Sequence, residues 1–294
     1  MNPNAPVVAG IDFTAPSPSV LLHALHTAAL TGAPVIAVHV LDSGILSHLS
    51  ASAGSNPVLD QVVEQGRHRL AQLVSQVDPG AKVRLEIRNG RPAEELHRLV
   101  EEEGASLLVI AANDLTKKRL GSIASRCVRT APCDVLVLRD WQEGNFSKVV
   151  VCTDFSPTSE LALARGVTMA AANGARLEIV HVMYPPTRDV WGEVLDHEEN
   201  SEVSYETECR DRANKAMAGF LAPSAEALSR IDHAPVLLES TMPSMALTHH
   251  IQDTEADLVI LGTRGMSRVA GFFIGTNAER LLHDAQVSVL AVRD

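Results

Sequence analysis

Glycine-rich turns late in the chain hold the residue types that a phosphate site needs. Directly after the apolar run 258–261 the chain reads Gly-Thr-Arg-Gly over 262–265, and after nine further residues it reads Gly-Thr-Asn over 275–277. Only glycine lets backbone N–H groups approach an anion so closely, and a helix that starts at the second turn adds the positive end of its dipole. Arg264 adds a fixed charge and Thr276 a hydroxyl donor. This spacing predicts a phosphate cradle between a buried strand and a helix start.

The sequence lacks the usual motifs of phosphoryl-transfer enzymes and hydrolases. It contains no Walker-type G-x-x-x-x-G-K-[ST], which would supply a lysine and a magnesium-ligating hydroxyl, and no G-x-S-x-G elbow. Binding is therefore favoured over hydrolysis. Two alternatives stay open: a slow ATPase or nucleotide hydrolase, and a protein-interaction module whose nucleotide site is vestigial.

Composition limits the partners of the chain. Among its 294 residues, 25 Lys and Arg stand against 36 Asp and Glu, so the net charge of −11 gives no overall attraction to nucleic acid or an anionic membrane. The first 66 residues contain no Lys or Arg, unlike a secretory signal, and no apolar run approaches the roughly 18 residues of a membrane span. We therefore expect a soluble, cytoplasmic protein that holds any phosphate by local contacts.

Cysteine, histidine and aromatic residues give weaker signals. The four cysteines have no C-x-x-C spacing, so reduced, mostly buried thiols are expected, and no set of ligands indicates a metal site. His39 and His181 end apolar runs, where a partly buried structural role is expected. Aromatic residues make up only 3% of the chain, so adenine, if bound, is expected to rest on aliphatic side chains.

An internal repeat organises the chain. Three matches share an offset of 142 residues, namely Asp12-Phe13 with Asp154-Phe155, Gly32 with Gly174, and His39-Val40 with His181-Val182. Later matches have larger offsets. The offset is 151 residues between 105–109 and 256–260, and 154 residues between Gly121-Ser122 and Gly275-Thr276. A short polar stretch at 141–145 separates the copies, so we expect one domain over 1–143 and a second over 144–294.

Each copy alternates between strand and helix patterns in the order β-α-β-α-β-α-β-α-β, and its strands lack the alternation of half-exposed ones. This order predicts an α/β fold of two tandem doubly wound domains, each with a five-stranded parallel sheet and with ligands at the carboxyl ends of the strands. In the second copy, strands are expected at 149–151, 177–182, 236–238, 258–261 and 287–292. The turn at 154–157 is expected to cap a helix that runs through Leu161 and Val167 and that Gly174 stops, and further helices are expected from 202 to 222, 245 to 253 and 277 to 283.

At these residues the chain resembles the universal stress protein family in its tandem form. The resemblance spans nearly the whole chain and rests on the Asp-Phe-[Ser/Thr] turn after the first strand, the His-Val that ends the second, and the G-x2-G-x9-G-[ST] loop. It implies the adenine nucleotide alpha hydrolase-like fold and a regulatory or protective role in the stress response. In nucleotide-binding members the Asp lies beside the adenosine, the Val backbone contacts adenine, and the loop wraps the phosphates. By position, these roles fall on Asp154, Val182, Gly262, Arg264, Gly265, Gly275, Thr276 and Asn277, with ATP, ADP or AMP as the ligand and Mg²⁺ as a possible companion.

The first copy departs from this loop. Ala111 and Asp114 stand where Gly262 and Gly265 stand in the second, and the segment from Asp114 to Gly121 is three residues shorter. An aspartate repels phosphates and a shorter loop does not surround them. We therefore hypothesise that the first domain binds no nucleotide and serves as a pseudo-symmetric docking partner.

The resemblance also bears on assembly and turnover. It implies that the last strands, Val135–Leu138 and Val287–Val292, meet about a two-fold within the chain and imitate the dimer of single-domain members. A further homodimer would then use another surface. Asp154 is the only carboxylate that the sequence places near the site, and it belongs on the adenosine side, so at most weak ATP hydrolysis is expected.

Overall fold

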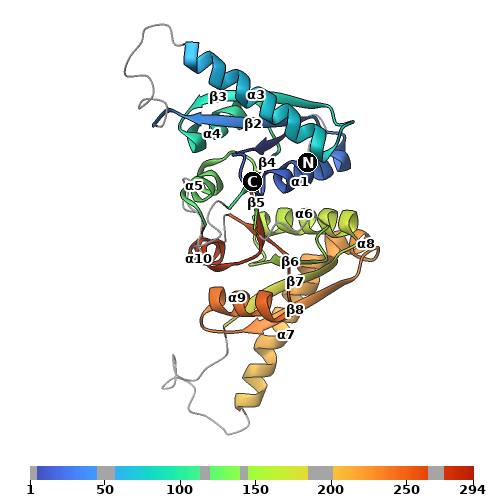
Figure 1. Ribbon diagram of the computed structural model, residues 1–294. Coiled ribbons are helices and arrows are strands. Elements are labelled where there is room, and N and C mark those ends of the chain that lie inside the picture. Colours follow the sequence, from blue (N-terminus) through green and yellow to red (C-terminus); the bar gives the residue numbers. More distant parts are fainter. Residues whose placement is uncertain (1–4, 45–56, 113–119, 140–144, 185–200, 264–274) are drawn as a thin grey trace. The chain divides into compact units, whose positions relative to one another are not determined.

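Strands and helices alternate along the chain, as the sequence pattern predicts (Figure 1). The structure is a computed structural model and describes residues 5–44, 57–112, 120–139, 145–184, 201–263 and 275–294. These residues form two units. The first holds the described residues from 5 to 145 together with 286–294, and the second holds those between 146 and 285.

The first unit is a twisted sheet with helices packed on it. The sheet has the strand order β3-β2-β1-β4-β5-β10. Neighbouring strands from β3 to β5 run parallel, and the order reverses between β1 and β4, which makes this a doubly wound sheet. Its elements are β1 (Val7–Gly10), α1 (Ser17–Thr31), β2 (Val35–Asp42), α3 (Pro57–Val77), β3 (Val83–Gly90), α4 (Pro92–Glu103), β4 (Leu107–Ala111), α5 (Ser122–Thr130), β5 (Asp134–Leu138) and β10 (Ser288–Val292).

The second unit repeats this arrangement. Its strand order is β9-β6-β7-β8, with every neighbouring pair parallel, so the order reverses between β6 and β9. Its strands and helices lie close to the predicted ranges, which confirms the α/β fold. They are β6 (Lys148–Cys152), α6 (Pro157–Asn173), β7 (Arg176–Met183), α7 (Ser201–Leu221), the short helices η2 (Ala222–Ser224) and α8 (Ala225–Leu228), β8 (His233–Glu239), α9 (Pro243–Asp253), β9 (Leu258–Gly262) and α10 (Thr276–Asp284).

Local chemistry explains where helix α6 begins and ends. The Ser156 hydroxyl accepts a hydrogen bond from the Ser159 N–H, and Pro157 occupies the first turn, where its missing N–H costs nothing. Gly174 ends the helix at φ 63°, in the left-handed region that glycine adopts without strain. This confirms the prediction that Gly174 stops the helix.

The cores form around the central strands. Val149, Val150 and Val151 of β6 are fully buried, as are Leu258, Val259 and Ile260 of the neighbouring β9. Side chains of both faces are buried because helices cover both sides of a parallel sheet, which explains why these strands read as continuous apolar runs. At the switch point, where the strand order reverses, the carboxyl ends of β6 and β9 lie next to each other.

The last strand of the sequence belongs to the first unit. β10 pairs antiparallel with β5, with Leu290 opposite Leu136. The Ser288 hydroxyl accepts a hydrogen bond from the Arg139 N–H at 3.1 Å and donates one to its carbonyl at 3.0 Å. At the other end, the Arg293 N–H donates to Asp134 Oδ1 at 2.9 Å, and its guanidinium donates to the carbonyls that end α5. A strand that closes the second repeat in sequence thus completes the first sheet.

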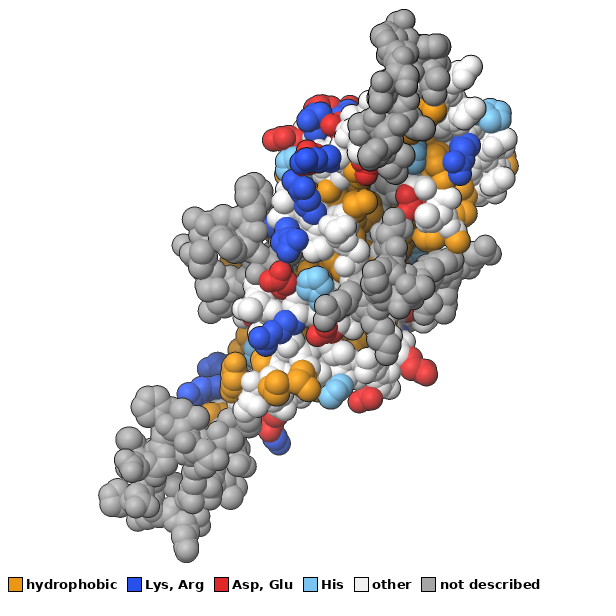
Figure 2. Space-filling view, turned by 60° about the vertical axis from the view of Figure 1, so that its left-hand side comes forward, with side chains coloured by type: hydrophobic (Ala, Val, Ile, Leu, Met, Phe, Trp, Pro, Cys, Tyr) orange, Lys and Arg blue, Asp and Glu red, His pale blue; other side chains and the backbone are white. Residues whose placement is uncertain are grey.

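Several charged side chains of the described surface lie next to opposite charges. Basic and acidic groups lie side by side on the face that Figure 2 shows. On the edge of the first sheet, Arg84 lies 2.6 Å from Glu103, and Arg88 lies 2.6 Å from Glu102. Within the described ranges, no helix combines the length and the apolar character needed to cross a membrane.

Candidate functional site

A cavity of about 460 Å³ opens in the second unit at its switch point. It lies at the carboxyl ends of β6, β7 and β9 and is bordered by α9 and by the start of α10. Its size falls within the range of roughly 300–1,000 Å³ that small-molecule sites usually have. Six of the eight sequence-predicted residues line it, and Arg264 and Gly265 lie outside the described residues. The six are Asp154, Val182, Gly262, Gly275, Thr276 and Asn277.

The start of α10 forms the polar end of the cavity. Gly275 is the N-cap of this helix, and among the described side chains none caps its first turn. The Gly275 N–H donates to the Thr263 carbonyl at 3.2 Å, which joins the two ends of the predicted loop. A Cβ on Gly275 would meet no atom within 4 Å. The N–H groups that follow, together with the Thr276 hydroxyl, form a donor set suited to an anion.

Gly262 has a packing role that the sequence did not reveal. A Cβ at this position would lie 2.9 Å from Thr158 Cγ2 at the start of α6, closer than such atoms approach in real proteins. The glycine therefore lets β9 and α6 come together at the floor of the cavity. This packing contact favours a glycine here whether or not a phosphate binds.

The Asp154 turn places a carboxylate on the wall. Asp154 Oδ1 accepts hydrogen bonds from the Ser156 N–H at 3.1 Å and from the Ser159 hydroxyl at 2.6 Å. Helix capping falls to Ser156, whose hydroxyl accepts from the Ser159 N–H. Asp154 thus braces the turn before the helix while it lines the cavity. A carboxylate fixed in this way is suited to accept hydrogen bonds from sugar hydroxyls.

A strained phenylalanine and a histidine shape the same turn. Phe155 has φ 62°, which a bulky residue rarely adopts. Its ring stacks on His181 with a centroid distance of 4.2 Å. His181 Nδ1 lies 2.8 Å from the Thr153 carbonyl, and because a carbonyl only accepts, Nδ1 carries the proton. These contacts give His181 the structural role expected from sequence.

Apolar side chains from β7 and α9 line another part of the cavity. Val182 and Tyr184 line it from the end of β7, and Pro243 and Leu247 line it from α9. Tyr184 is the residue that sequence reasoning missed, because the low aromatic content predicted aliphatic contacts alone. A signal was present, since side chains two residues apart on a strand share a face and Val182 was already a candidate.

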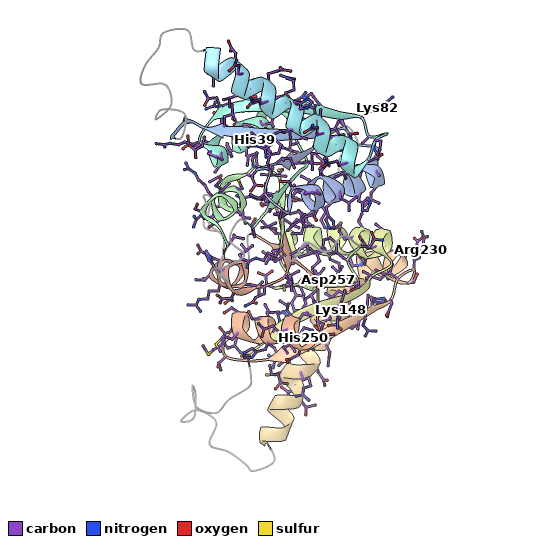
Figure 3. The ribbon with its side chains drawn as sticks, in the orientation of Figure 1. His39, Lys82, Lys148, Arg230, His250 and Asp257 are labelled. Atoms are coloured by element: carbon purple, nitrogen blue, oxygen red, sulfur yellow. The ribbon has the colours of Figure 1, made fainter. Side chains whose placement is uncertain are left out.

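An ionic cluster around the buried Glu178 holds helix α9 against the sheet. Glu178 of β7 lies 2.8 Å from His250 Nε2 of α9 and 3.1 Å from Lys148 Nζ of β6 (Figure 3). Burial alone would raise the pKa of Glu178, but hydrogen bonds from Lys148 and His250 outweigh it and lower that pKa. The ionised Glu178 therefore supports the helix that carries Pro243 and Leu247.

Cys152 lines the cavity without being a reactive thiol. Burial raises its pKa to about 12, so the thiol stays protonated near neutral pH. Burial also raises the pKa of Cys127 and of Cys133 to about 12. Within the part of the chain that the structure describes, no three His, Cys, Asp or Glu residues form a group that could hold a metal.

The first unit has a much smaller cavity at the equivalent place, of about 90 Å³. The repeat offsets match its lining residues with those of the larger cavity: Asp12 with Asp154, His39 with His181 and Leu96 with Leu247. Ile123 lies where Asn277 lies in the second unit. The start of α5 has Gly121 as N-cap, as α10 has Gly275, so both copies keep a helix start at this point.

Two doubly wound sheets with a cavity at a switch point define a tandem protein of the Rossmann-like α/β class. Comparison with known proteins gives the family. The universal stress protein family model matches residues 4–139 and 145–293, so the chain belongs to this family in its tandem form.

Individual relatives agree with this assignment. A universal stress protein of Thermus aquaticus is 32% identical over 148 residues, covering 50% of this chain and 99% of its own length. Another from Mycolicibacterium smegmatis is 25% identical, covering 98% of this chain and 96% of its own. The crystal structure of a universal stress protein from Archaeoglobus fulgidus shares the fold, with a TM-score of 0.65 and 18% identity over 98% of each chain.

Proposed function

We propose that this universal stress protein binds one adenine nucleotide in its second domain, 144–294, and acts as a nucleotide-responsive regulatory or protective protein. The observation that carries the proposal is the cavity of about 460 Å³, which combines an apolar end with the start of helix α10. A nucleotide has the same two parts, a flat apolar base and a charged phosphate chain. The donor set and the volume both fit it.

The polarity of the cavity gives the ligand a direction. Phosphates belong at Gly275, Thr276 and Asn277, where the helix dipole favours an anion by roughly 0.3–1 kcal/mol, and more in a partly buried site. Arg264 and Gly265, together with Gly262, are proposed to complete the phosphate loop. The base then belongs at the apolar end beside the Val182 backbone, with Asp154 at the sugar.

Binding is proposed in preference to turnover. Asp154 is the only carboxylate among the described residues that line the cavity. Its Oδ1 already accepts two hydrogen bonds within its own turn, and it lies in the turn after β6 rather than at the start of α10. A hydrolase would need a base or a metal ligand near the terminal phosphate.

The first domain, 1–143, is proposed to bind no nucleotide. Its cavity of about 90 Å³ is well below the size of usual ligand sites, and Ile123 replaces a polar side chain at the helix start. The asymmetry therefore predicts at most one nucleotide per chain.

Released ligand tests this proposal directly. Freshly purified full-length protein is denatured, and the released nucleotide is identified and counted by mass spectrometry. Calorimetric titration with ATP, ADP and AMP follows. An adenine nucleotide at no more than one per chain supports the proposal, whereas two per chain contradict the asymmetry. No released nucleotide together with no calorimetric response would instead favour a protein-interaction module.

A further inference from the structure

A largely exposed aromatic side chain lines the apolar part of the cavity. Tyr184 is one of only two tyrosines in the chain, and it is 67% exposed. Val182 and Tyr184 both line the proposed nucleotide cavity, while Met183 between them lines a different cavity beside α7. This alternation is expected at the end of a strand, and it directs the Tyr184 ring to the side where the ligand would lie.

Helix α9 contributes an aliphatic wall to the same cavity, and this wall is well supported. Pro243 and Leu247 are one helical turn apart on α9, so they share a face. His250, one turn further along, hydrogen bonds to buried Glu178 and fixes the helix against β7. An aromatic ring and a fixed aliphatic wall at one end of a cavity provide the two apolar surfaces that a flat base needs.

The first unit shows that the fold does not require this ring. The 142-residue offset that matches Asp12 with Asp154 places Asp42 at the position of Tyr184. Asp42 Oδ1 accepts a hydrogen bond from the Gly44 N–H at 2.8 Å, and Asp42 does not line the small cavity. The aliphatic wall is nevertheless kept, as Pro92 and Leu96. The aromatic ring is therefore specific to the unit with the large cavity.

We propose that Tyr184 is a specificity-determining residue, whose ring stacks on the base and makes the site favour purine over pyrimidine nucleotides. The inference rests on the proposed nucleotide site. A bicyclic purine overlaps a phenol ring over a larger area than a single pyrimidine ring does, so stacking distinguishes the two. Because Tyr184 is largely exposed, its ring is available for this contact.

The test compares ATP and CTP on the full-length protein by calorimetry. Tyr184→Ala is expected to weaken ATP binding about tenfold, the usual effect of losing one stacked base, and to weaken CTP binding less. The matched Tyr184→Phe variant keeps the ring and is expected to bind ATP within about twofold of the unchanged protein. Because Tyr184 is largely exposed, both variants are expected to keep the thermal midpoint of unfolding.

Two results would overturn the inference while leaving nucleotide binding intact. One is a Tyr184→Ala variant that binds ATP as tightly as the unchanged protein, and the other is an equal loss for ATP and CTP. Failure of the unchanged protein to bind either nucleotide would instead overturn the proposed function and this inference with it. The two failures are thus distinguished within one set of titrations.

Discussion

The two units contain the same turn, but the cavities beside it differ greatly in volume. Phe13 and Phe155 have φ values of 61° and 62°, and their rings lie 4.4 and 4.2 Å from His39 and His181. Each histidine places Nδ1 near the carbonyl before the Asp, at 2.7 and 2.8 Å. Yet the cavities measure about 90 and 460 Å³. The strained turn is therefore part of the fold, and the side chains around it decide whether a ligand fits.

The two units differ at several described positions in and beside the cavities. Ile123 replaces Asn277 at the helix start, and Asp42 replaces Tyr184 at the strand end. At the floor, a Cβ on Gly10 would lie 2.8 Å from Ile110 Cγ2, whereas Cys152 stands at the equivalent place in the second unit. The framework of the turn is thus kept in both units, while the size of the cavity beside it is not.

The largest difference between the two units is expected when a negative charge is added at the start of α10 or, as the matched change, at the start of α5. Thr276→Asp is expected to weaken ATP binding about 1,000-fold, because like charges about 4 Å apart repel by about 4 kcal/mol at an effective dielectric constant near 20. Adenosine, which carries no phosphate, should bind almost unchanged. The matched variant Ser122→Asp in the first unit should leave ATP affinity unaltered. Calorimetry that finds equal losses in both variants would contradict the one-site proposal.

Acid is expected to destabilise the first unit through His23. Burial, with a smaller contribution from the charge of His26, lowers the pKa of His23 to about 4. Because the folded pKa lies below the unfolded value of 6.5, stability is full above pH 6.5 and falls as the pH drops toward 4. The loss approaches about 3 kcal/mol, since one pKa unit corresponds to about 1.36 kcal/mol.

Urea unfolding of the full chain between pH 8 and pH 4 measures this loss. The control variant His23→Leu removes the titrating group and keeps a similar volume, so much of the acid dependence should disappear. At the equivalent position of the second unit the chain has Arg165, which is not fully buried. An unchanged acid dependence in His23→Leu would show that another group is responsible.

A methyl group at residue 262 tests the packing role of that glycine. In Gly262→Ala the new Cβ would approach Thr158 Cγ2 to 2.9 Å, and overpacking of this kind typically costs about 1–3 kcal/mol. The free energy of unfolding from urea titration gives the size. Adding Thr158→Ser removes the opposing methyl and should restore part of the loss. The first unit already has Ala111 there, so no gain is expected from Ala111→Gly, and full stability in Gly262→Ala would refute the steric account.

An exchange of the helix-start residues gives the smallest predicted effect. Asn277→Ile installs the first unit's side chain in the second and should weaken ATP binding about tenfold, because one polar contact to a charged group is worth about 1.5–3 kcal/mol. The reverse variant, Ile123→Asn, should not create a second site, since the small cavity stays too small. A second ATP site in Ile123→Asn, counted by calorimetry, would mean that this one position controls the asymmetry.

Features fixed by neighbouring residues were predictable from sequence. The helix that starts after Ser156 and stops at Gly174 follows from capping and from the left-handed conformation of glycine, both of which are local. The buried strands follow from continuous apolar runs. The repeat allowed most of the proposed ligand residues to be assigned to the carboxyl ends of strands. Those that the structure describes line one cavity.

Features that depend on distant contacts were not predictable. The packing of Gly262 against Thr158 joins residues about a hundred positions apart, so no local pattern carries it. Tyr184 was overlooked because the low aromatic content is an average over the whole chain. A single aromatic ring at one position is enough to line a cavity. The roles of all eight proposed ligand residues stay predictions, and Arg264 and Gly265 lie outside the described residues.

The placement of β10 has a consequence for synthesis of the protein. The first sheet is one strand short until residues 286–294 have been made, so the β5 edge has no strand beside it while the second unit is translated. At about 5–20 residues per second, that delay lasts roughly 7 to 30 s, and an open strand edge is prone to wrong pairing during such a time. A nascent chain that stops before residue 286 therefore lacks the strand that covers the β5 edge of the half that was made first.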